Sequence, residues 1–256
     1  MKSALPLEGS VAVISGGLGD IGHATAVYLR ELGATVALGD RLPPDEAGER
    51  AKGFHYLAVE VSDEAGVEKW IGQVQRDLGT PTLAVLNAGI VTTGAASEIK
   101  TQDWKQTLDV NLSGALYVAQ AVVRRMKAES LPGSLVFVGS WAAHAPHSNL
   151  AAYSVSKAGL RMLAQCFALE LAGLGIRVNE IAPGYVNAGL SRQLFEADPA
   201  LEARCAEGVP NQKMITPSEV ARQIGWLCDP ANRHLVGSVL LMDGGLSLLQ
   251  GPSGKA

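Results

Sequence analysis

One stretch near the N-terminus decides the fold: Val11-Ala12-Val13-Ile14-Ser15-Gly16-Gly17-Leu18-Gly19-Asp20-Ile21-Gly22. Its first four residues are apolar and indicate a short buried strand, and a helical pattern over residues 21–32 follows the stretch. Between them, residues 17–22 satisfy the pattern Gly-x-Gly-x-x-Gly. Glycines in such a turn let backbone N–H groups approach a pyrophosphate, which the helix N-terminus attracts. Its setting between strand and helix predicts a dinucleotide-binding turn; the alternative is a merely tight turn.

Short apolar runs and longer amphipathic stretches alternate along the chain. The candidate strands are Val11–Ile14, Thr35–Leu38, Tyr56–Val59, Leu83–Leu86, Leu135–Val138, Arg177–Ile181 and Ser238–Met242. The candidate helices are Ile21–Leu32, Glu64–Leu78, Thr101–Lys127, Ala151–Ala172 and Pro217–Leu227. Six or seven such repeats, with strands apolar throughout, imply a parallel sheet covered on both faces and joined by right-handed crossovers. We predict one α/β domain over residues 1–256, a doubly wound parallel sheet of about seven strands.

The composition excludes several classes of protein. The chain has 256 residues, of which 47% are hydrophobic and 18% charged, so a disordered chain is not expected. A net charge of −4 disfavours a nucleic-acid partner. No apolar run reaches the roughly 18 residues of a membrane helix, and Pro6 and Glu8 interrupt any signal-peptide core, so we expect a soluble, cytoplasmic protein without a membrane partner. Cys166, Cys205 and Cys228 lack metal-ligand spacing.

Two segments are less regular than the rest. Residues 43–52 form a charged, proline-interrupted segment after the second strand, and residues 188–216 form a long mixed segment after the sixth. Ligands of open α/β sheets bind beyond the carboxyl ends of the strands. We therefore interpret 188–216 as a substrate lid. An ordinary helical connection is the alternative.

Asp40 ends the second candidate strand, 18 residues after Gly22. An acid at about this distance from the glycine turn accepts hydrogen bonds from a ribose and repels a 2′-phosphate. The sequence therefore favours NAD over NADP as the cofactor. Arg41 follows directly and partly offsets this argument, and a loop acid without a role is the alternative.

Tyr153 and Lys157 lie four residues apart in a helical stretch, which puts both on one face. A tyrosine with a pKa near 10 is a poor base at neutral pH. A cation at about 4 Å supplies roughly the energy that lowers this pKa to ~7. Alone the pair fits an ordinary surface helix, but Ser140 follows the fifth strand, only 13 residues before Tyr153.

Further motifs follow the other strands. Asn87-Ala88-Gly89 follows the fourth strand, Asn111 lies in the next helix, Pro183-Gly184 ends the sixth strand, and Asp243-Gly244-Gly245 follows the seventh. Together with the glycine turn and the Tyr-xxx-Lys pair, this set resembles the short-chain dehydrogenase/reductase family, of the NAD-preferring kind. The resemblance covers roughly Leu7 to Leu246 and implies a Rossmann-type fold.

The resemblance also implies roles for four residues. Tyr153 would be the general acid/base, and Lys157 would lower its pKa and hold the nicotinamide ribose. Ser140 would hydrogen-bond the reacting oxygen. Asn111 would kink its helix and position a water in a proton relay. Hydride transfer itself is the chemistry of the cofactor.

The residues expected around NAD come from the turn, the strand ends and the catalytic helix. They are Gly16, Gly19, Asp20, Ile21, Gly22, Asp40, Arg41, Glu60, Val61, Asn87, Ala88, Gly89, Tyr153, Lys157, Pro183, Gly184 and Val186. Four positions depart from the family pattern. Leu86, Glu60 and Ala188 replace the usual Asn, Asp and Thr. Asp20 replaces the second glycine; an acid there should repel a pyrophosphate, so we expect Asp20 to cap the following helix and point away.

The expected substrate residues are Trp141, His144, His147, Tyr185 and Arg192. Two histidines suit a polar or acidic substrate, and Arg192 would meet an anion or remain solvated. His144-x-x-His147 lacks a third ligand, so no metal is expected.

The leading hypothesis is an NAD-dependent enzyme that interconverts a small polar secondary alcohol (a sugar, polyol or hydroxy acid) and its carbonyl. The alternatives are a reductase of 3-oxoacyl or other ketones, and a non-catalytic nucleotide-binding protein. Helices 101–127 and 151–172 have counterparts in the family that pair across subunits, so the resemblance also implies a homotetramer.

Overall fold

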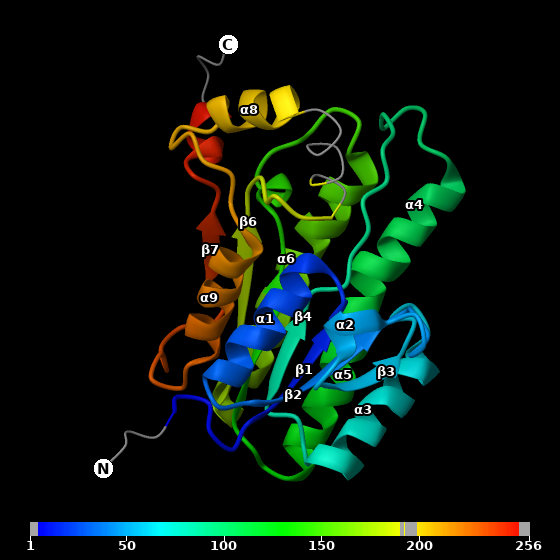
Figure 1. Ribbon diagram of the computed structural model, residues 1–256, viewed down its shortest axis with the longest axis vertical. Helices are drawn as coiled ribbons and strands as arrows, with labels where there is room; N and C mark the ends of the chain where they lie inside the picture. Colours follow the sequence, from blue (N-terminus) through cyan, green and yellow to red (C-terminus); the bar gives the residue numbers. More distant parts are fainter. Residues whose placement is uncertain (1–4, 190–191, 193–198, 251–256) are drawn as a thin grey trace.

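The computed structural model describes residues 5–189, 192 and 199–250, and its centre is one parallel sheet (Figure 1). The sheet has seven strands in the order β3-β2-β1-β4-β5-β6-β7, and every neighbouring pair is parallel. The strands are β1 (Val11–Ser15), β2 (Thr35–Asp40), β3 (His55–Ala58), β4 (Leu83–Leu86), β5 (Gly133–Val138), β6 (Ile176–Pro183) and β7 (Val239–Met242). The predicted doubly wound parallel sheet is confirmed.

Helices cover both faces of the sheet, and successive strand residues point to opposite layers. On one side α1 (Asp20–Glu31) and α9 (Pro217–Cys228) pack over Ala12, Ile14 and other strand residues. On the other side α3 (Glu64–Leu78), α5 (Gly114–Ala128) and α6 (Ala151–Leu171) pack over their neighbours, such as Val13. The central strands β1, β4 and β5 are therefore buried on both faces, which is why they are mostly apolar.

The predicted helix over 101–127 is not one regular helix. It consists of α4 (Thr101–Leu108), a π-helical turn over Asp109–Ser113 and α5. The sequence pattern missed the turn because a single inserted residue barely changes the apolar period. Two shorter helices are α2 (Gly48–Ala51), in the charged segment after β2, and α8 (Pro199–Glu207).

The predicted lid, residues 188–216, is described at 188–189, 192 and 199–216; its residues 190–191 and 193–198 lie outside the described residues. In Figure 1, α8 lies beyond the carboxyl ends of β6 and β7, which point upward. Asn187 donates from Nδ2 to Oε1 of Glu202 in α8 at 2.8 Å. A backbone bridge joins Val186 to Ile215, so both ends of the segment return to the end of β6.

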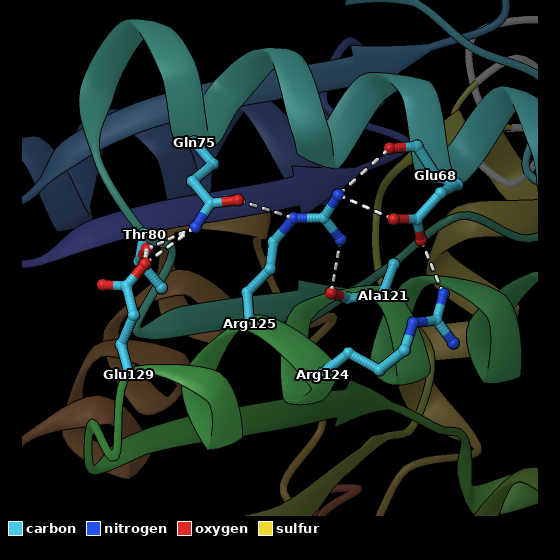
Figure 2. A network of polar contacts seen from close by, with 7 residues as sticks. All are labelled: Glu68, Gln75, Thr80, Ala121, Arg124, Arg125 and Glu129. Atoms are coloured by element: carbon cyan, nitrogen blue, oxygen red, sulfur yellow. Dashed lines mark hydrogen bonds and ion pairs between the residues drawn. The ribbon is translucent and has the colours of Figure 1, made fainter.

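A polar network joins α3 to α5 (Figure 2). Glu68 accepts a hydrogen bond from Nη2 of Arg125 at 2.7 Å and another from Nη2 of Arg124 at 2.6 Å. Gln75 accepts from Nε of Arg125 at 3.1 Å. The side chain of Arg125 is 14% exposed and that of Arg124 is 53% exposed. Water therefore screens the ion pair of Arg125 with Glu68 less than that of Arg124 with Glu68. The Arg125 hydrogen bond is the largest influence that holds the pKa of Glu68 below its usual value.

Arg177 anchors α9 to the sheet. It lies buried on β6 and donates to the carbonyl oxygens of Leu227 at 2.9 Å, Cys228 at 3.0 Å and Asp229 at 3.1 Å. These carbonyls end the helix and have no partner within it. A guanidinium suits this position because the C-terminal end of a helix carries partial negative charge.

Candidate active site

The predicted site residues converge at the carboxyl edge of the sheet. Because all seven strands are parallel, the loops after β1, β2, β4, β5 and β6 meet at that edge. Gly16 lies against Ala88 after β4, since a Cβ on Gly16 would be 2.8 Å from the Ala88 Cα. A Cβ on Gly89 would be 3.4 Å from Oδ1 of Asn111 and 3.6 Å from Nζ of Lys157. The structure therefore brings the glycine turn, the Asn-Ala-Gly loop and the catalytic candidates together.

The glycine turn is tightly closed against its own helix. A Cβ on Gly22 would lie 2.2 Å from the carbonyl oxygen of Gly16, so no larger residue fits there. Asn87 donates from Nδ2 to the same oxygen at 2.9 Å. Ser15 accepts at Oγ from the backbone N–H groups of Asn87 and Ala88. The loop after β4 thus holds the turn in shape, while Leu86, which departs from the family pattern, is buried in the core.

Asp40 lies beside the glycine turn, as predicted for an acid that binds a ribose. Its Oδ2 accepts from the backbone N–H of Leu18 at 3.0 Å, and its Oδ1 accepts from the N–H of Arg41 at 2.8 Å. Tyr56 donates its hydroxyl to the backbone carbonyls of Asp40, at 3.3 Å, and of Leu42. The carboxylate therefore also orders the turn. Further along the edge, Glu60 accepts from the N–H of Ser62 at 3.4 Å.

Asp20 does not cap α1, contrary to the expectation from the sequence. The N-cap of α1 is Gly19, without a side-chain capping bond. Asp20 instead accepts from Nη2 of Arg50 at 2.5 Å, Nη1 of Arg192 at 2.9 Å and the N–H of Gly189 at 2.6 Å. Burial favours its neutral form, but these three partners outweigh it and hold the pKa of Asp20 below its usual value. The side chain points to the arginines because ion pairing satisfies a 6% exposed carboxylate better than one backbone bond does.

Tyr153, Ser140 and Lys157 form the predicted catalytic group. The Ser140 side chain acts to lower the pKa of Tyr153, and Nζ of Lys157 lies 5.7 Å from the centre of the Tyr153 ring. Lys157 is buried and donates to the carbonyl of Val138 at 2.8 Å. Burial lowers the pKa of Lys157 to about 8, against a smaller opposing effect of Glu180.

The expected lowering of the tyrosine pKa is not found in the protein alone. Burial raises the pKa of Tyr153, although the hydrogen bond with Ser140 acts in the other direction. The reason is that the low-dielectric surroundings of the ring disfavour the phenolate, while Lys157 is engaged with Val138. Tyr153 is therefore protonated at neutral pH in this state.

Asn111 occupies the centre of the π-helical turn and is fully buried. Its Oδ1 accepts from the N–H of Ile90 at 2.8 Å, and its Nδ2 donates to the carbonyl of Ile90 at 2.9 Å and to Oγ of Ser156 at 3.0 Å. Asn111 thus ties the loop after β4 to the helix that carries Tyr153. A kink was expected at Asn111, and the structure has a π-helical turn there; the kink and the water remain predictions.

The predicted substrate residues lie on the loop after β5 and at the end of β6. The Trp141 ring packs edge-on against His147, with centroids 4.2 Å apart, and against Tyr185, with centroids 5.4 Å apart. Trp141 is itself buried with Val209 and Leu246.

Burial lowers the pKa values of His144 and His147, so both are neutral at pH 7. Neutral imidazoles bind hydroxyl groups by hydrogen bonds rather than attract anions by charge. Arg192, which is expected near the substrate, forms an ion pair with Asp20.

A sequence profile of the family described as enoyl-(acyl carrier protein) reductase matches residues 17–247. The 2,3-dihydro-2,3-dihydroxybenzoate dehydrogenase of Escherichia coli (strain K12) is 33% identical, over 95% of this chain and 99% of that protein. A short-chain type dehydrogenase/reductase from Mycobacterium marinum has a similar structure, with a TM-score of 0.85 and 29% identity over 95% of this chain and 97% of that one. The chain belongs to the short-chain dehydrogenase/reductase family.

Two other members of the family resemble this short-chain dehydrogenase/reductase over nearly their whole length. The cis-4-hydroxycyclohexanecarboxylate dehydrogenase of Sinomonas cyclohexanicum is 33% identical, over 92% of this chain and 95% of that protein. A gluconate 5-dehydrogenase from Burkholderia cenocepacia, in complex with NADP and tartrate, has a TM-score of 0.87 and 28% identity, over 96% of this chain and 98% of that one. Members of the family thus bind a nicotinamide cofactor.

The site of this short-chain dehydrogenase/reductase fits such a cofactor. The glycine turn lies against the start of α1, and its glycines place no side chain where a pyrophosphate would bind. The N-terminus of α1 also has no side-chain capping bond that would compete with a pyrophosphate. Asp20 would oppose the phosphates, but Arg50 and Arg192 compensate its charge. Within the described residues, no group of three or more His, Cys, Asp or Glu side chains is placed to hold a metal ion. None of the described helices is long and apolar enough to cross a membrane.

Three further residues of this region are evident only in the structure. Arg50 donates from Nη1 to the carbonyl of Leu18 at 2.6 Å in addition to pairing with Asp20. Arg161 and Glu180 form a buried ion pair behind the catalytic group. The sequence signals were an arginine in the charged segment after β2 and a glutamate inside a candidate strand. Neither signal identifies its partner, because the partners are far away in the chain.

Proposed function

We propose that this short-chain dehydrogenase/reductase oxidises a small polar secondary alcohol, of the sugar, polyol or hydroxy acid class, with NAD. The observation that carries the proposal is the position of Tyr153, beside the Lys157 ammonium and near Ser140, at the edge of the sheet where the glycine turn lies. A tyrosine so placed serves as the acid/base for a hydroxyl group held next to it. The cofactor, when bound, accepts the hydride.

The chain's own residues then have separate tasks. Ser140 donates a hydrogen bond to the substrate oxygen and orients it. Tyr153, once deprotonated, takes the hydroxyl proton of the substrate. Lys157 holds positive charge beside the phenolate, which offsets the desolvation that otherwise keeps Tyr153 protonated. Asn111 keeps the loop after β4 fixed against the catalytic helix.

The relatives support a substrate that carries hydroxyl and carboxylate groups. Their names specify a dihydroxylated dihydrobenzoate, a hydroxycyclohexanecarboxylate and gluconate. Among the three proposed classes we therefore favour a hydroxy acid. The neutral His144 and His147 supply hydrogen-bond partners for its hydroxyl groups.

Asp40 supports NAD as the cofactor. A carboxylate at the end of β2 accepts from both ribose hydroxyls and repels a 2′-phosphate. The Burkholderia relative was found with NADP, and Arg41 and Arg50 lie close to the same turn, so the experiment below compares NAD with NADP.

A second candidate function is the reduction of a ketone, including a 3-oxoacyl substrate. The observation that favours it is the raised pKa of Tyr153, because a protonated tyrosine is ready to donate to a carbonyl oxygen. The description of the matching family, an enoyl-(acyl carrier protein) reductase, agrees with the reductive direction.

The experiment follows cofactor absorbance with NAD and then NADP over hydroxy acids, aldoses, polyols and simple secondary alcohols, and then with reduced cofactors over the matching ketones. We expect turnover with NAD on one polar class. Tyr153→Phe should bind NAD, measured by calorimetry, but lose at least about 100-fold in kcat. Tyr28→Phe, on α1 away from the site, is the matched control. Turnover in Tyr153→Phe at the rate of Tyr28→Phe would refute the mechanism, and turnover only with ketones would select the second candidate.

We also propose that α6 pairs with a second copy of the chain, as the family resemblance implies for a homotetramer. Val155, Met162 and Leu169 recur every seven residues along α6 and are all exposed. Such a row of apolar side chains on one helix face suits burial against another subunit. Light scattering should report an oligomer, and Met162→Glu with Leu169→Glu should reduce its mass. A monomeric wild-type protein contradicts the proposal.

A further inference from the structure

Glu180 is a charged residue on a strand that lies between two others in the sheet. It lies on β6, opposite Phe137 of β5, and is 1% exposed. Burial raises its pKa, more than its cationic neighbours lower it. A buried carboxylate costs several kcal/mol unless partners satisfy it. The catalytic scheme above gives Glu180 no task, so its position needs a separate explanation.

Arg161 satisfies both oxygens of this carboxylate. Its Nε donates to Oε2 of Glu180 at 2.9 Å and its Nη2 donates to Oε1 at 3.2 Å. Arg161 comes four residues after Lys157 and eight after Tyr153, so the three side chains share one face of α6. The ion pair thus continues the catalytic row of the helix.

The pair also supports the backbone that carries Ser140. A Cβ on Gly139 would be 1.9 Å from Oε1 of Glu180, so the carboxylate lies directly on the Gly139 backbone. Gly139 separates Val138, whose carbonyl accepts from Lys157, from Ser140. Arg161 reaches the same loop further on, donating from Nη1 to the carbonyl of Ala143 at 3.4 Å.

Several charges face the Lys157 and Tyr153 pair. Arg161 lies on their own helix and Glu180 on β6. His144, on the loop after β5, interacts with Arg161 and with Asp243 after β7. Of these groups, Glu180 acts directly on Lys157, where its negative charge favours the ammonium form against burial.

We propose that Glu180 and Arg161 are positioning residues of the active site: the buried pair holds the loop of Ser140 against Tyr153, and its carboxylate supplies the negative charge that Lys157 faces. The roles of Ser140, Tyr153 and Lys157 rest on the proposed function. The bracing of the loop rests on contacts alone, and it is tested without substrate.

The first test measures hydrogen exchange of the peptide spanning residues 138–147 by mass spectrometry. In this segment the N–H of Ala142 donates to Oγ of Ser140 at 3.1 Å and the N–H of His144 to the carbonyl of Trp141 at 2.8 Å. In Glu180→Gln the amide hydrogens of this peptide should exchange at least about tenfold faster than in the wild-type protein. Glu68→Gln, which also removes a carboxylate bound by two arginine donors but on α3, is the matched control and should leave the peptide unchanged.

The second test measures the pH dependence of kcat/KM for alcohol oxidation. Removing a nearby negative charge makes it easier for the Tyr153 and Lys157 pair to lose a proton. In Glu180→Gln both limbs of the kcat/KM profile should therefore move to lower pH, by about 0.5 to 1 unit. Arg161→Lys keeps the charge but not the two-point contact. Arg161→Lys should therefore speed hydrogen exchange of residues 138–147 and leave both limbs of the kcat/KM profile at the same pH. It replaces Glu180→Gln in the exchange experiment if that variant fails to fold.

The outcomes separate this proposal from the proposed function. A wild-type protein without turnover on any alcohol or ketone contradicts the proposed function, while the exchange experiment still decides the bracing. If residues 138–147 exchange their amide hydrogens at the same rate in Glu180→Gln, Arg161→Lys and the control Glu68→Gln, the bracing is overturned. An active Glu180→Gln variant with an unshifted pH profile overturns the electrostatic part.

Discussion

Gly139 should be among the least replaceable residues of this enzyme, and Gly139→Ala tests the packing behind the active site. The added Cβ would be 1.9 Å from Oε1 and 2.6 Å from Cδ of Glu180. The two groups would have to separate by 1.5 Å to reach the 3.4 Å at which ordinary van der Waals contact begins. A carboxylate at the end of a side chain often moves aside, but Glu180 is buried and held by two bonds to Arg161.

The cost follows from these contacts. Moving the carboxylate that far breaks at least one of the two bonds to Arg161, and a hydrogen bond to a charged group contributes about 1.5–3 kcal/mol. Overpacking of a dense interior costs about 1–3 kcal/mol more. We expect Gly139→Ala to lower the free energy of unfolding by about 3–5 kcal/mol, a large share of the 5–15 kcal/mol typical of a protein.

The assay is urea unfolding at pH 7, with the thermal midpoint as a second readout. For a chain of this size the expected loss corresponds to a drop of about 10–15 °C. Gly173→Ala is the matched control, because a Cβ on Gly173 meets no atom within 4 Å and its φ is not positive. It should change the free energy of unfolding by less than about 1 kcal/mol.

Activity provides a second readout of the same substitution. Since Gly139 precedes Ser140, we expect kcat to fall along with stability in the Gly139→Ala variant. Equal unfolding free energies for Gly139→Ala and Gly173→Ala, with unchanged kcat, would refute the reasoning. That result would mean that the carboxylate of Glu180 moves freely.

Three further predictions concern the cofactor, the sheet and the lid. Asp40→Ser should lower kcat/KM for NAD by about 10- to 100-fold and raise it for NADP, measured by cofactor reduction; unchanged selectivity would contradict the role of Asp40. Arg177→Met should cost about 3 kcal/mol in urea unfolding, because it removes the hydrogen bonds of a buried guanidinium to the carbonyls of Leu227, Cys228 and Asp229, whereas the exposed Arg124→Met should cost less than about 1 kcal/mol. Asp20 has a folded pKa below its ordinary 3.8, so its ion pairs stabilise the protein above that pH and are lost as the pH falls through the folded value. The stability deficit of Asp20→Asn should therefore be full at pH 7 and shrink below pH 3.8, and a deficit independent of pH would contradict the ion pairs.

The sequence by itself predicted the strands, the glycine turn and the catalytic helix. These features are local, because a buried strand shows as a short apolar run and a helix face as a spacing of four residues. Tyr153 and Lys157 therefore had to share a face wherever the helix lay. The parallel order of the strands then required Ser140 and Asn87, which follow strands, to meet at one edge.

The tertiary structure alone decided what surrounds these groups. Asp20 was predicted to cap its helix, but its partners Arg50 and Gly189 lie 30 and 169 residues away, and no local pattern encodes such contacts. The pKa of Tyr153 was predicted to fall, but burial raises it, since desolvation depends on every element packed around the ring. The contact of Glu180 with Gly139 exists only because β5 and β6 are neighbours in the sheet. Sequence spacing predicted which residues would do the chemistry, and packing between distant segments decided the charges and positions of these residues.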